Sequence, residues 1–221
     1  MSELLPAVEI ETAPNPRTSI IWMHGLGADG NDFVPIVNEL DLPDTPIRFV
    51  FPHAPVMPVT INYGHRMRAW YDVLSSDFAE RTDNEGVRAS QKLVEALIAR
   101  EKERGSAADR IVIAGFSQGG AMALHTGLRH AERLAGIMAL STYLPIPDAL
   151  TQEGSAANRD VPIFMAHGDQ DQVIPIEYAA QSRDLLTTQG YQVEWHAYHM
   201  PHSVCMEEIA HIGAWLQRVL G

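Results

Sequence analysis

The stretch IVIAGFSQGG, residues 111–120, combines a short apolar run with the pattern Gly-x-Ser-x-Gly. The run 111–114 is rich in β-branched side chains and predicts a buried strand, and helical spacing begins directly after Ser117. In this strand–turn–helix context, the pattern presents a nucleophilic serine on a sharp, strained turn. Gly115 and Gly119 are then needed because a Cβ at either position would strike the neighbouring strand or helix. In the alternative interpretation, Ser117 only caps the following helix.

Short apolar runs alternate with segments of helical periodicity along the rest of the chain. The predicted strands are residues 8–12, 18–23, 47–51, 110–116, 134–140, 161–166 and 191–198, and the predicted helices are 84–104, 118–129, 176–189 and 203–220. Most strands are continuously apolar, which is typical of parallel strands covered on both faces. We expect 8–12 to be an antiparallel edge strand and 191–198, which carries Glu194, to lie nearer an edge. The pattern predicts one three-layer α/β domain, residues 1–221, with a mostly parallel sheet.

The segment 84–104 has the clearest amphipathic spacing. Its apolar stripe includes Val94 and Ile98, and Glu101 is expected on the opposite, solvent-facing side. By contrast, residues 52–68 and 142–160 show no clear period and are predicted to be long loops. In an open α/β sheet such loops overhang the carboxyl ends of the strands, where ligands bind.

Composition limits the classes of function. The 221 residues include 16 Lys and Arg against 28 Asp and Glu, a net charge of −12 that would repel a nucleic acid backbone or an anionic bilayer. The single cysteine, Cys205, rules out an intrachain disulfide. No secretory leader is recognisable, and no apolar run approaches the length of about 18 residues that suggests a membrane span. We therefore expect a cytoplasmic protein without nucleic acid partners or stable membrane insertion.

A second glycine motif, GLGADG at residues 25–30, matches the dinucleotide fingerprint Gly-x-Gly-x-x-Gly. Asp29 and Asp32 would place negative charge where that fingerprint binds pyrophosphate. The predicted strand 47–51 is followed by Pro52, His53 and Ala54, without the carboxylate that would bind a ribose. Nucleotide binding is therefore disfavoured, and no cofactor is expected.

A nucleophilic serine needs a base and a carboxylate that orients the base. Asp171 follows the predicted strand 161–166, and His202 follows the last strand, which gives the order Ser, Asp, His that the elbow motif requires. Asp169 and His199 are the alternatives on the same two loops. We favour Asp171, with Asp169 bonding turn amides, and His202, because it lies immediately before the last helix.

The spacing of His196, His199 and His202 also suggests a metal site. On a strand followed by a turn that contains a proline, this spacing does not bring three rings to one point, and a metal is not expected. The glycines of residues 24–27 favour another function for the first motif. Their loop can supply one oxyanion donor, the amide of Leu26, and the residue after the nucleophile, Gln118, can supply the second.

These motifs together resemble the phospholipase/carboxylesterase family of α/β-hydrolases, which includes acyl-protein thioesterases and small bacterial carboxylesterases. The resemblance runs nearly end to end and rests on HGLGADG at 24–30, AWYD at 69–72, GFSQGG at 115–120, HGDQDQVIP at 167–175 and the pair at 202–203. It implies an α/β-hydrolase fold without a large cap, and Ser117, Asp171 and His202 as the catalytic triad. Pro201 departs from the pattern, where Gly or a small residue is expected, and it restricts the loop before His202.

The resemblance and the motifs predict a serine carboxylesterase that hydrolyses short to medium acyl esters, with lysophospholipids and S-acyl thioesters as further candidates. Met57, Val59, Ile61 and Leu74, near Trp70, either line an apolar acyl groove or simply close the edge of the core. A dienelactone-type hydrolase is an alternative that Ser117 disfavours, since those enzymes normally carry cysteine at the elbow. A non-catalytic small-molecule binding module is the other alternative. Apolar residues around 52–68 suggest a homodimer.

Overall fold

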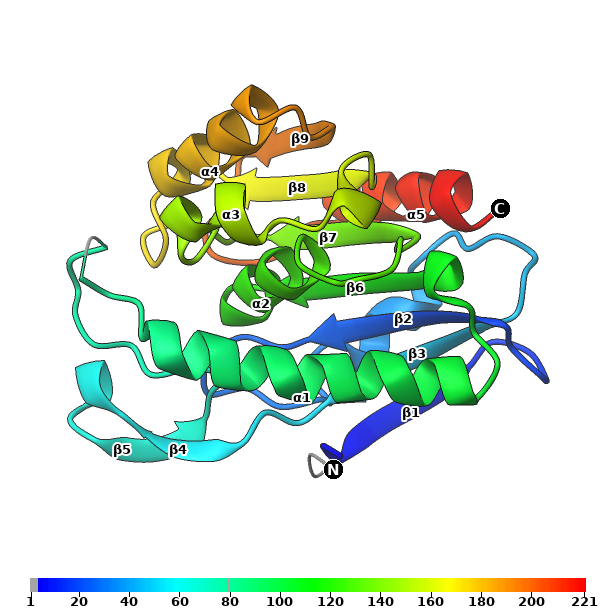
Figure 1. Ribbon diagram of the computed structural model, residues 1–221, viewed down its shortest axis with the longest axis horizontal. Coiled ribbons are helices and arrows are strands. Elements are labelled where there is room, and N and C mark those ends of the chain that lie inside the picture. The colour runs from blue at the N-terminus through cyan, green and yellow to red at the C-terminus, as the bar shows by residue number, and fades with distance from the viewer. Residues whose placement is uncertain (1–3, 79) are drawn as a thin grey trace.

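The computed structural model describes residues 4–78 and 80–221, and a seven-stranded sheet runs through its centre (Figure 1). The strands lie in the order β1-β3-β2-β6-β7-β8-β9, and only the β1–β3 pair is antiparallel. Their bounds are β1 (Ala7–Glu11), β2 (Thr18–Met23), β3 (Ile47–Pro52), β6 (Ile111–Phe116), β7 (Gly136–Leu140), β8 (Ile163–Gly168) and β9 (Val193–Tyr198). The mostly parallel sheet, the antiparallel edge strand β1 and the edge position of β9 confirm the predicted fold class.

Helices cover both faces of this sheet. The structure has α1 (Asn84–Glu103), α2 (Gln118–Gly127), α3 (Leu150–Glu153) and α4 (Ile176–Thr188) in front of the sheet in Figure 1, and α5 (Met206–Leu220) behind it. The predicted last helix begins later than expected, because residues 201–204 form the turn that carries His202. Among the described residues, no helix is both long and apolar enough to cross a membrane.

Each central strand sends alternate side chains into two separate cores. In β2, Ile21 and Met23 pack with the α1 and α2 side, whereas Ile20 and Trp22 pack with the α5 side. This alternation follows from the period of two in a strand. Burial on both faces explains why the strands read as continuous apolar runs.

Glu101 on α1 corrects one expectation, because it is fully buried instead of facing solvent. It accepts hydrogen bonds from Ser19 Oγ at 2.7 Å and from Arg48 Nη1 and Arg104 Nη1 at 3.0 Å. Burial opposes its ionisation, yet the bonds from Ser19 and Arg48 hold the pKa of Glu101 below its usual value. Position 101 continues the buried stripe of Val94 and Ile98, so the helical period favoured burial and the charge misled the prediction.

The predicted loop 52–68 is instead largely a β-hairpin. Strands β4 (Val56–Val59) and β5 (His65–Arg68) form a separate two-stranded antiparallel sheet. In Figure 1 it lies at the left, the end toward which the arrows of the parallel strands point. Strands of this length are too short to display a period, and the prolines obscured them. The other predicted loop, 142–160, contains α3 and two short 3-10 helices, η4 (Pro147–Ala149) and η5 (Ala156–Asn158).

Glu208, in the first turn of α5, is a second buried carboxyl group, but it lacks charged partners. It is fully buried, and neither of its carboxyl oxygens makes a hydrogen bond within the described part of the chain. Burial raises the pKa of Glu208 to about 8, which the nearby amide of Cys205 offsets only in part. Glu208 therefore carries its proton at neutral pH.

We predict that Glu208 makes the folded protein less stable as pH rises. In the folded protein the Glu208 carboxyl has a pKa of about 8, whereas an ordinary glutamate carboxyl has a pKa of 4.5. As pH rises across this window, Glu208 therefore ionises in the unfolded chain first. Relative to Glu208→Gln, wild-type stability should fall by up to about 1.4 kcal/mol per pH unit there. Urea unfolding of both proteins from pH 5 to pH 9 measures the difference, and parallel curves would contradict this assignment.

Candidate active site

Ser117 lies at a sharp turn between β6 and α2. Its backbone adopts φ 55° and ψ −121°, a strained conformation for a residue with a side chain. A Cβ on Gly115 would lie 2.2 Å from the carbonyl group of Gly119, and one on Gly119 would lie 2.2 Å from Met23 O. Both flanking glycines are therefore required for the turn. The Ser117 side chain makes no capping hydrogen bond to α2, which excludes the interpretation of Ser117 as only a helix cap.

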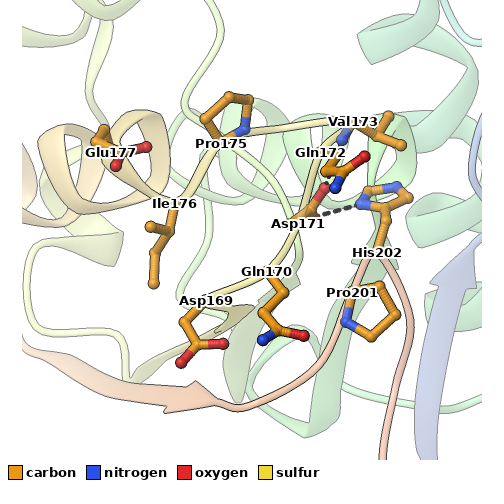
Figure 2. Close-up of a pocket in the computed structure, with 10 residues that line it drawn as sticks. All are labelled: Asp169, Gln170, Asp171, Gln172, Val173, Pro175, Ile176, Glu177, Pro201 and His202. Carbon is orange, nitrogen blue, oxygen red and sulfur yellow. Dashed lines mark hydrogen bonds and ion pairs between the residues drawn. The ribbon is translucent and has the colours of Figure 1, made fainter.

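Asp171 and His202 meet on the loops after β8 and β9, as Figure 2 shows. Asp171 Oδ2 lies 2.5 Å from His202 Nδ1, and Asp171 Oδ1 accepts from the amides of Val173 at 2.8 Å and Ile174 at 2.9 Å. Since a carboxylate oxygen accepts, Nδ1 carries the ring proton. His202 Nε2 is then the free basic nitrogen, and it has no hydrogen-bond partner among the described residues.

His167, which we did not predict as a site residue, supports the Asp171 carboxylate. Its Nε2 lies 2.8 Å from Ile174 O and 3.3 Å from Asp171 Oδ2, and both histidine and carboxylate side chains are fully buried. Burial opposes the ionisation of Asp171, but hydrogen bonds from His167 and His202 and from the amide of Ile174 hold its pKa well below its usual range. Asp171 is therefore an ionised acceptor of fixed orientation. The sequence signal for His167 was its place in the HGDQDQVIP motif.

Phe116 brings the His202 ring to the serine turn. The two ring centroids are 4.7 Å apart, and Phe116 directly precedes Ser117. Ser117 is 8% exposed, and among the described residues its hydroxyl has no hydrogen-bond partner. Hydrogen bonds of a catalytic site are often completed only when substrate binds. A cavity of about 880 Å³ borders Asp171 and His202 (Figure 2). Its other lining residues are Asp169, Gln170, Gln172, Val173, Pro175, Ile176, Glu177 and Pro201.

The alternatives Asp169 and His199 pair with each other instead. His199 Nδ1 lies 3.2 Å from Asp169, and the side chains are 78% and 48% exposed. The prediction that Asp169 bonds turn amides was wrong, because Asp171 accepts those bonds. The three histidines considered as a metal site have different partners. The His196 ring stacks on Phe164 at 5.1 Å, whereas His199 pairs with Asp169 and His202 with Asp171. Within residues 4–78 and 80–221, no group of three or more His, Cys, Asp or Glu is arranged to hold a metal.

The backbone around Pro201 packs closely on the end of β8. A Cβ on Gly168 would lie 2.2 Å from Met200 O and 2.7 Å from Pro201 O. Gln170 N donates to Met200 O at 3.1 Å. These contacts use carbonyl groups, so the missing N–H of proline costs no hydrogen bond here. The unexpected proline is thus compatible with the contact between Asp171 and His202.

Two backbone amides flank Ser117. Gly25 lies so close that a Cβ there would be 3.3 Å from Ser117 Cβ, which places the Gly25–Leu26 peptide beside the serine. Gln118 begins α2, so its amide has no partner inside the helix. In the described part of the chain, the amides of Leu26 and Gln118 have no hydrogen-bond acceptor. Both are therefore available to an oxygen atom bound next to Ser117.

The side chain of Gln118 has a role that the sequence did not suggest. Its Oε1 accepts from Trp70 N at 2.8 Å, and its Nε2 donates to Tyr71 O at 2.7 Å. These bonds attach the segment 69–72 to the start of α2. Gln118 is 5% exposed, so the connection is shielded from water.

The structure places the residues expected at an acyl groove in different surroundings. Trp70 is 1% exposed, and its Nε1 donates to His24 O at 2.9 Å, so it packs against the backbone of the loop after β2 and does not line an open groove. Leu74 is 47% exposed. Met57 and Ile61 pack with Leu26 in a small third cluster, built by the hairpin around buried Val59, Ala69 and Val73.

Comparison with known sequences identifies relatives of nearly full length. A model of the phospholipase/carboxylesterase family matches residues 6–220. Acyl-protein thioesterase 1 of Yarrowia lipolytica is 38% identical over 218 residues, covering 96% of this chain and 96% of the relative. The protein of the same name from Neurospora crassa is 40% identical over 220 residues, covering 93% of this chain and 86% of the relative.

Solved structures agree with the sequence relatives. The crystal structure of Arabidopsis thaliana SOBER1 has a TM-score of 0.87 and 31% identity, covering 93% of this chain and 100% of that one. Zea mays acyl-protein thioesterase 2 has a TM-score of 0.85 and 27% identity, covering 98% and 100%. The family match, the sequence identities and the shared fold show that this chain belongs to the phospholipase/carboxylesterase family of α/β-hydrolases.

Proposed function

We propose that this protein is a serine carboxylesterase with Ser117 as nucleophile, His202 as base and Asp171 as the residue that orients the base. The observation that carries the proposal is the 2.5 Å contact between Asp171 Oδ2 and His202 Nδ1, formed beside the strained Ser117 turn. Membership of the family supports ester or thioester hydrolysis. The single thiol, Cys205, fits action in the cytoplasm, where no disulfide is needed.

The reaction follows from these groups. Ser117 Oγ attacks the acyl carbonyl carbon while His202 Nε2 takes the hydroxyl proton, and the ionised Asp171 stabilises the resulting imidazolium. His202 then returns the proton to the leaving alcohol or thiol as the bond to the acyl carbon breaks. Water attacks the acyl-serine, again losing a proton to His202, and releases the carboxylic acid together with free Ser117.

The amides of Leu26 and Gln118 would stabilise the negative oxygen of both tetrahedral intermediates. Neither amide has another acceptor in the described residues, so no existing bond must break. One such donor is typically worth about 3 kcal/mol of transition-state stabilisation.

The substrate class that we propose is short to medium acyl esters, with S-acyl thioesters and lysophospholipids as candidates. The relatives named acyl-protein thioesterases favour the thioester. Met57 and Ile61, which pack with Leu26, would contact the acyl chain next to the proposed oxyanion site. Val56 and Tyr63 of the same hairpin are exposed, and the homodimer expected through this region stays a prediction.

A non-catalytic binding module is the alternative from another class. It would need the pocket but not an ionised, oriented Asp171 or a serine on strained backbone. Such strain and such a perturbed carboxyl are typical of catalytic sites. The dienelactone-type alternative is disfavoured by the hydroxyl in place of a thiol at position 117.

We predict that Ser117→Ala abolishes turnover. Wild-type protein should hydrolyse p-nitrophenyl butyrate and react with a fluorophosphonate probe, because both reactions need the serine oxygen. The alanine variant should lose labelling and about 10⁶-fold in kcat, as for other triad nucleophiles. An alanine variant with near-native turnover and an unchanged melting temperature would contradict the assignment of the nucleophile.

Asp171 and Asp169, on the loop after β8, allow a matched pair of variants to be compared. Asp171→Asn should lower kcat by about 10⁴-fold, because an amide cannot hold and stabilise the His202 imidazolium. Asp169→Asn should stay within about twofold, since its pair with His199 is solvent-exposed. Steady-state kinetics and thermal melts of both variants measure this. Equal losses, or the larger loss in Asp169→Asn, would show that the orienting carboxylate is misassigned.

We predict that the hairpin cluster sets the acyl-chain preference. Met57→Ala and Ile61→Ala should each lower kcat/KM for p-nitrophenyl octanoate by about 5- to 20-fold and leave the acetate ester within about twofold, because only the long chain loses apolar contact. Val56→Ala, on the exposed side of the same hairpin, is the control. If all chain lengths responded alike, the acyl-groove interpretation would be wrong.

A further inference from the structure

The ring of His24 lies between the backbone of Gly25, in the proposed oxyanion loop, and the backbone of Ala54. His24 is 2% exposed and follows the last residue of β2. Its Nδ1 lies 2.7 Å from Gly25 O, and its Nε2 lies 3.1 Å from Ala54 N. His24 O accepts from Trp70 Nε1 at 2.9 Å, so both the ring and the backbone of this residue are held.

These contacts define which nitrogen of the His24 ring carries the proton. A carbonyl oxygen only accepts, so Nδ1 carries a hydrogen, and an amide only donates, so Nε2 carries none. Burial lowers the pKa of His24, an effect that its bond to Gly25 O opposes only in part. His24 is thus a neutral imidazole that is protonated on Nδ1, with both nitrogens hydrogen-bonded.

The Gly25 carbonyl and the Leu26 N–H belong to the same peptide unit. Among the described residues there are no cis peptide bonds, so this unit is trans, and its C=O and N–H point in opposite directions. The His24 ring holds the carbonyl from one side, and Ala28 N adds a second bond at 3.3 Å. The direction of the Gly25 carbonyl therefore sets the direction of the Leu26 N–H.

We infer that His24 is a positioning residue, whose Nδ1–H fixes the Gly25–Leu26 peptide so that the Leu26 amide faces the oxyanion beside Ser117. The inference rests on the proposed esterase function and adds a residue to it. The Nε2 bond to Ala54 keeps the ring from rotating. The loop is further held by Gly27 N, which donates to Arg68 O at 2.9 Å, and by Arg68 Nη1, which donates to Ala54 O at 2.8 Å.

Two substitutions at position 24 each preserve one of the two hydrogen bonds that the His24 ring makes. His24→Asn places an amide NH₂ near the position of Nδ1 and can still donate to Gly25 O. His24→Gln places its amide near the position of Nε2, where it can accept from Ala54 N but cannot reach Gly25 O. A role in ordinary packing would impair the two variants similarly, whereas positioning of the peptide favours the asparagine.

We expect His24→Gln to lower kcat for p-nitrophenyl butyrate by about 10- to 100-fold with KM within about threefold, because a misdirected donor acts mainly in the transition state. His24→Asn should retain about tenfold more kcat than His24→Gln. The affinity for an alkyl boronic acid, which forms a tetrahedral adduct with serine, should fall in parallel with kcat.

His53 supplies the matched control, because its Nδ1 accepts from Gly30 N at 3.0 Å at the other end of the same loop. His53→Asn and His53→Gln should leave kcat within about threefold. Equal kcat in the two His24 variants, or a loss confined to KM, would overturn the inference. Failure of wild-type protein to hydrolyse any ester would instead overturn the proposed function.

A measurement on wild-type protein covers the case in which the variants do not fold. Long-range ¹H–¹⁵N spectra distinguish the two neutral forms of a histidine ring. The inference requires the His24 ring to be protonated on Nδ1, and the Leu26 amide resonance to shift when the boronic acid binds. A ring protonated on Nε2, or a Leu26 amide that does not respond, would overturn it.

Discussion

The backbone turn at Ser117 is the constraint on which the rest of the site depends. A residue with a side chain is held at φ 55°, and the turn closes only because Gly115 and Gly119 leave room for adjacent backbone. Such strain costs on the order of 1–3 kcal/mol and persists because β6 and α2 are both anchored in the cores. The turn places the hydroxyl at the carboxyl edge of the sheet and leaves the Gln118 amide free.

Hydrogen bonds to backbone groups, most of them made by side chains, connect the parts of the site. Gln118 holds the segment 69–72, Asp171 holds the turn at 173–174, and the His202 loop is bonded to the end of β8. The bonds made by Gln118 and the bond from Ile174 N to Asp171 are buried, where a hydrogen bond is strong and its loss is costly. In the proposed site, the contact between Asp171 and His202 is therefore formed without substrate, whereas no hydrogen bond joins Ser117 to His202 in the described residues.

The sheet, its strand boundaries to within a few residues and the meeting of Asp171 with His202 followed from the sequence, because parallel strands end at one edge and their loops converge there. Other features did not follow from it. The short strands β4 and β5 are too brief for a periodic signal. Glu101 and Trp70 were judged by residue type, whereas their burial depends on partners from distant segments. Whether the triad acts as proposed stays a prediction.

The most direct test of the central claim is to trap the acyl-enzyme. Protein mixed briefly with p-nitrophenyl acetate is quenched in acid, digested and mapped by mass spectrometry. The account predicts an acetyl group on the peptide that contains Ser117, accumulating in wild-type protein and absent from Ser117→Ala. An acetyl group at another nucleophile such as Cys205, or ester hydrolysis with no covalent intermediate at Ser117, would contradict it.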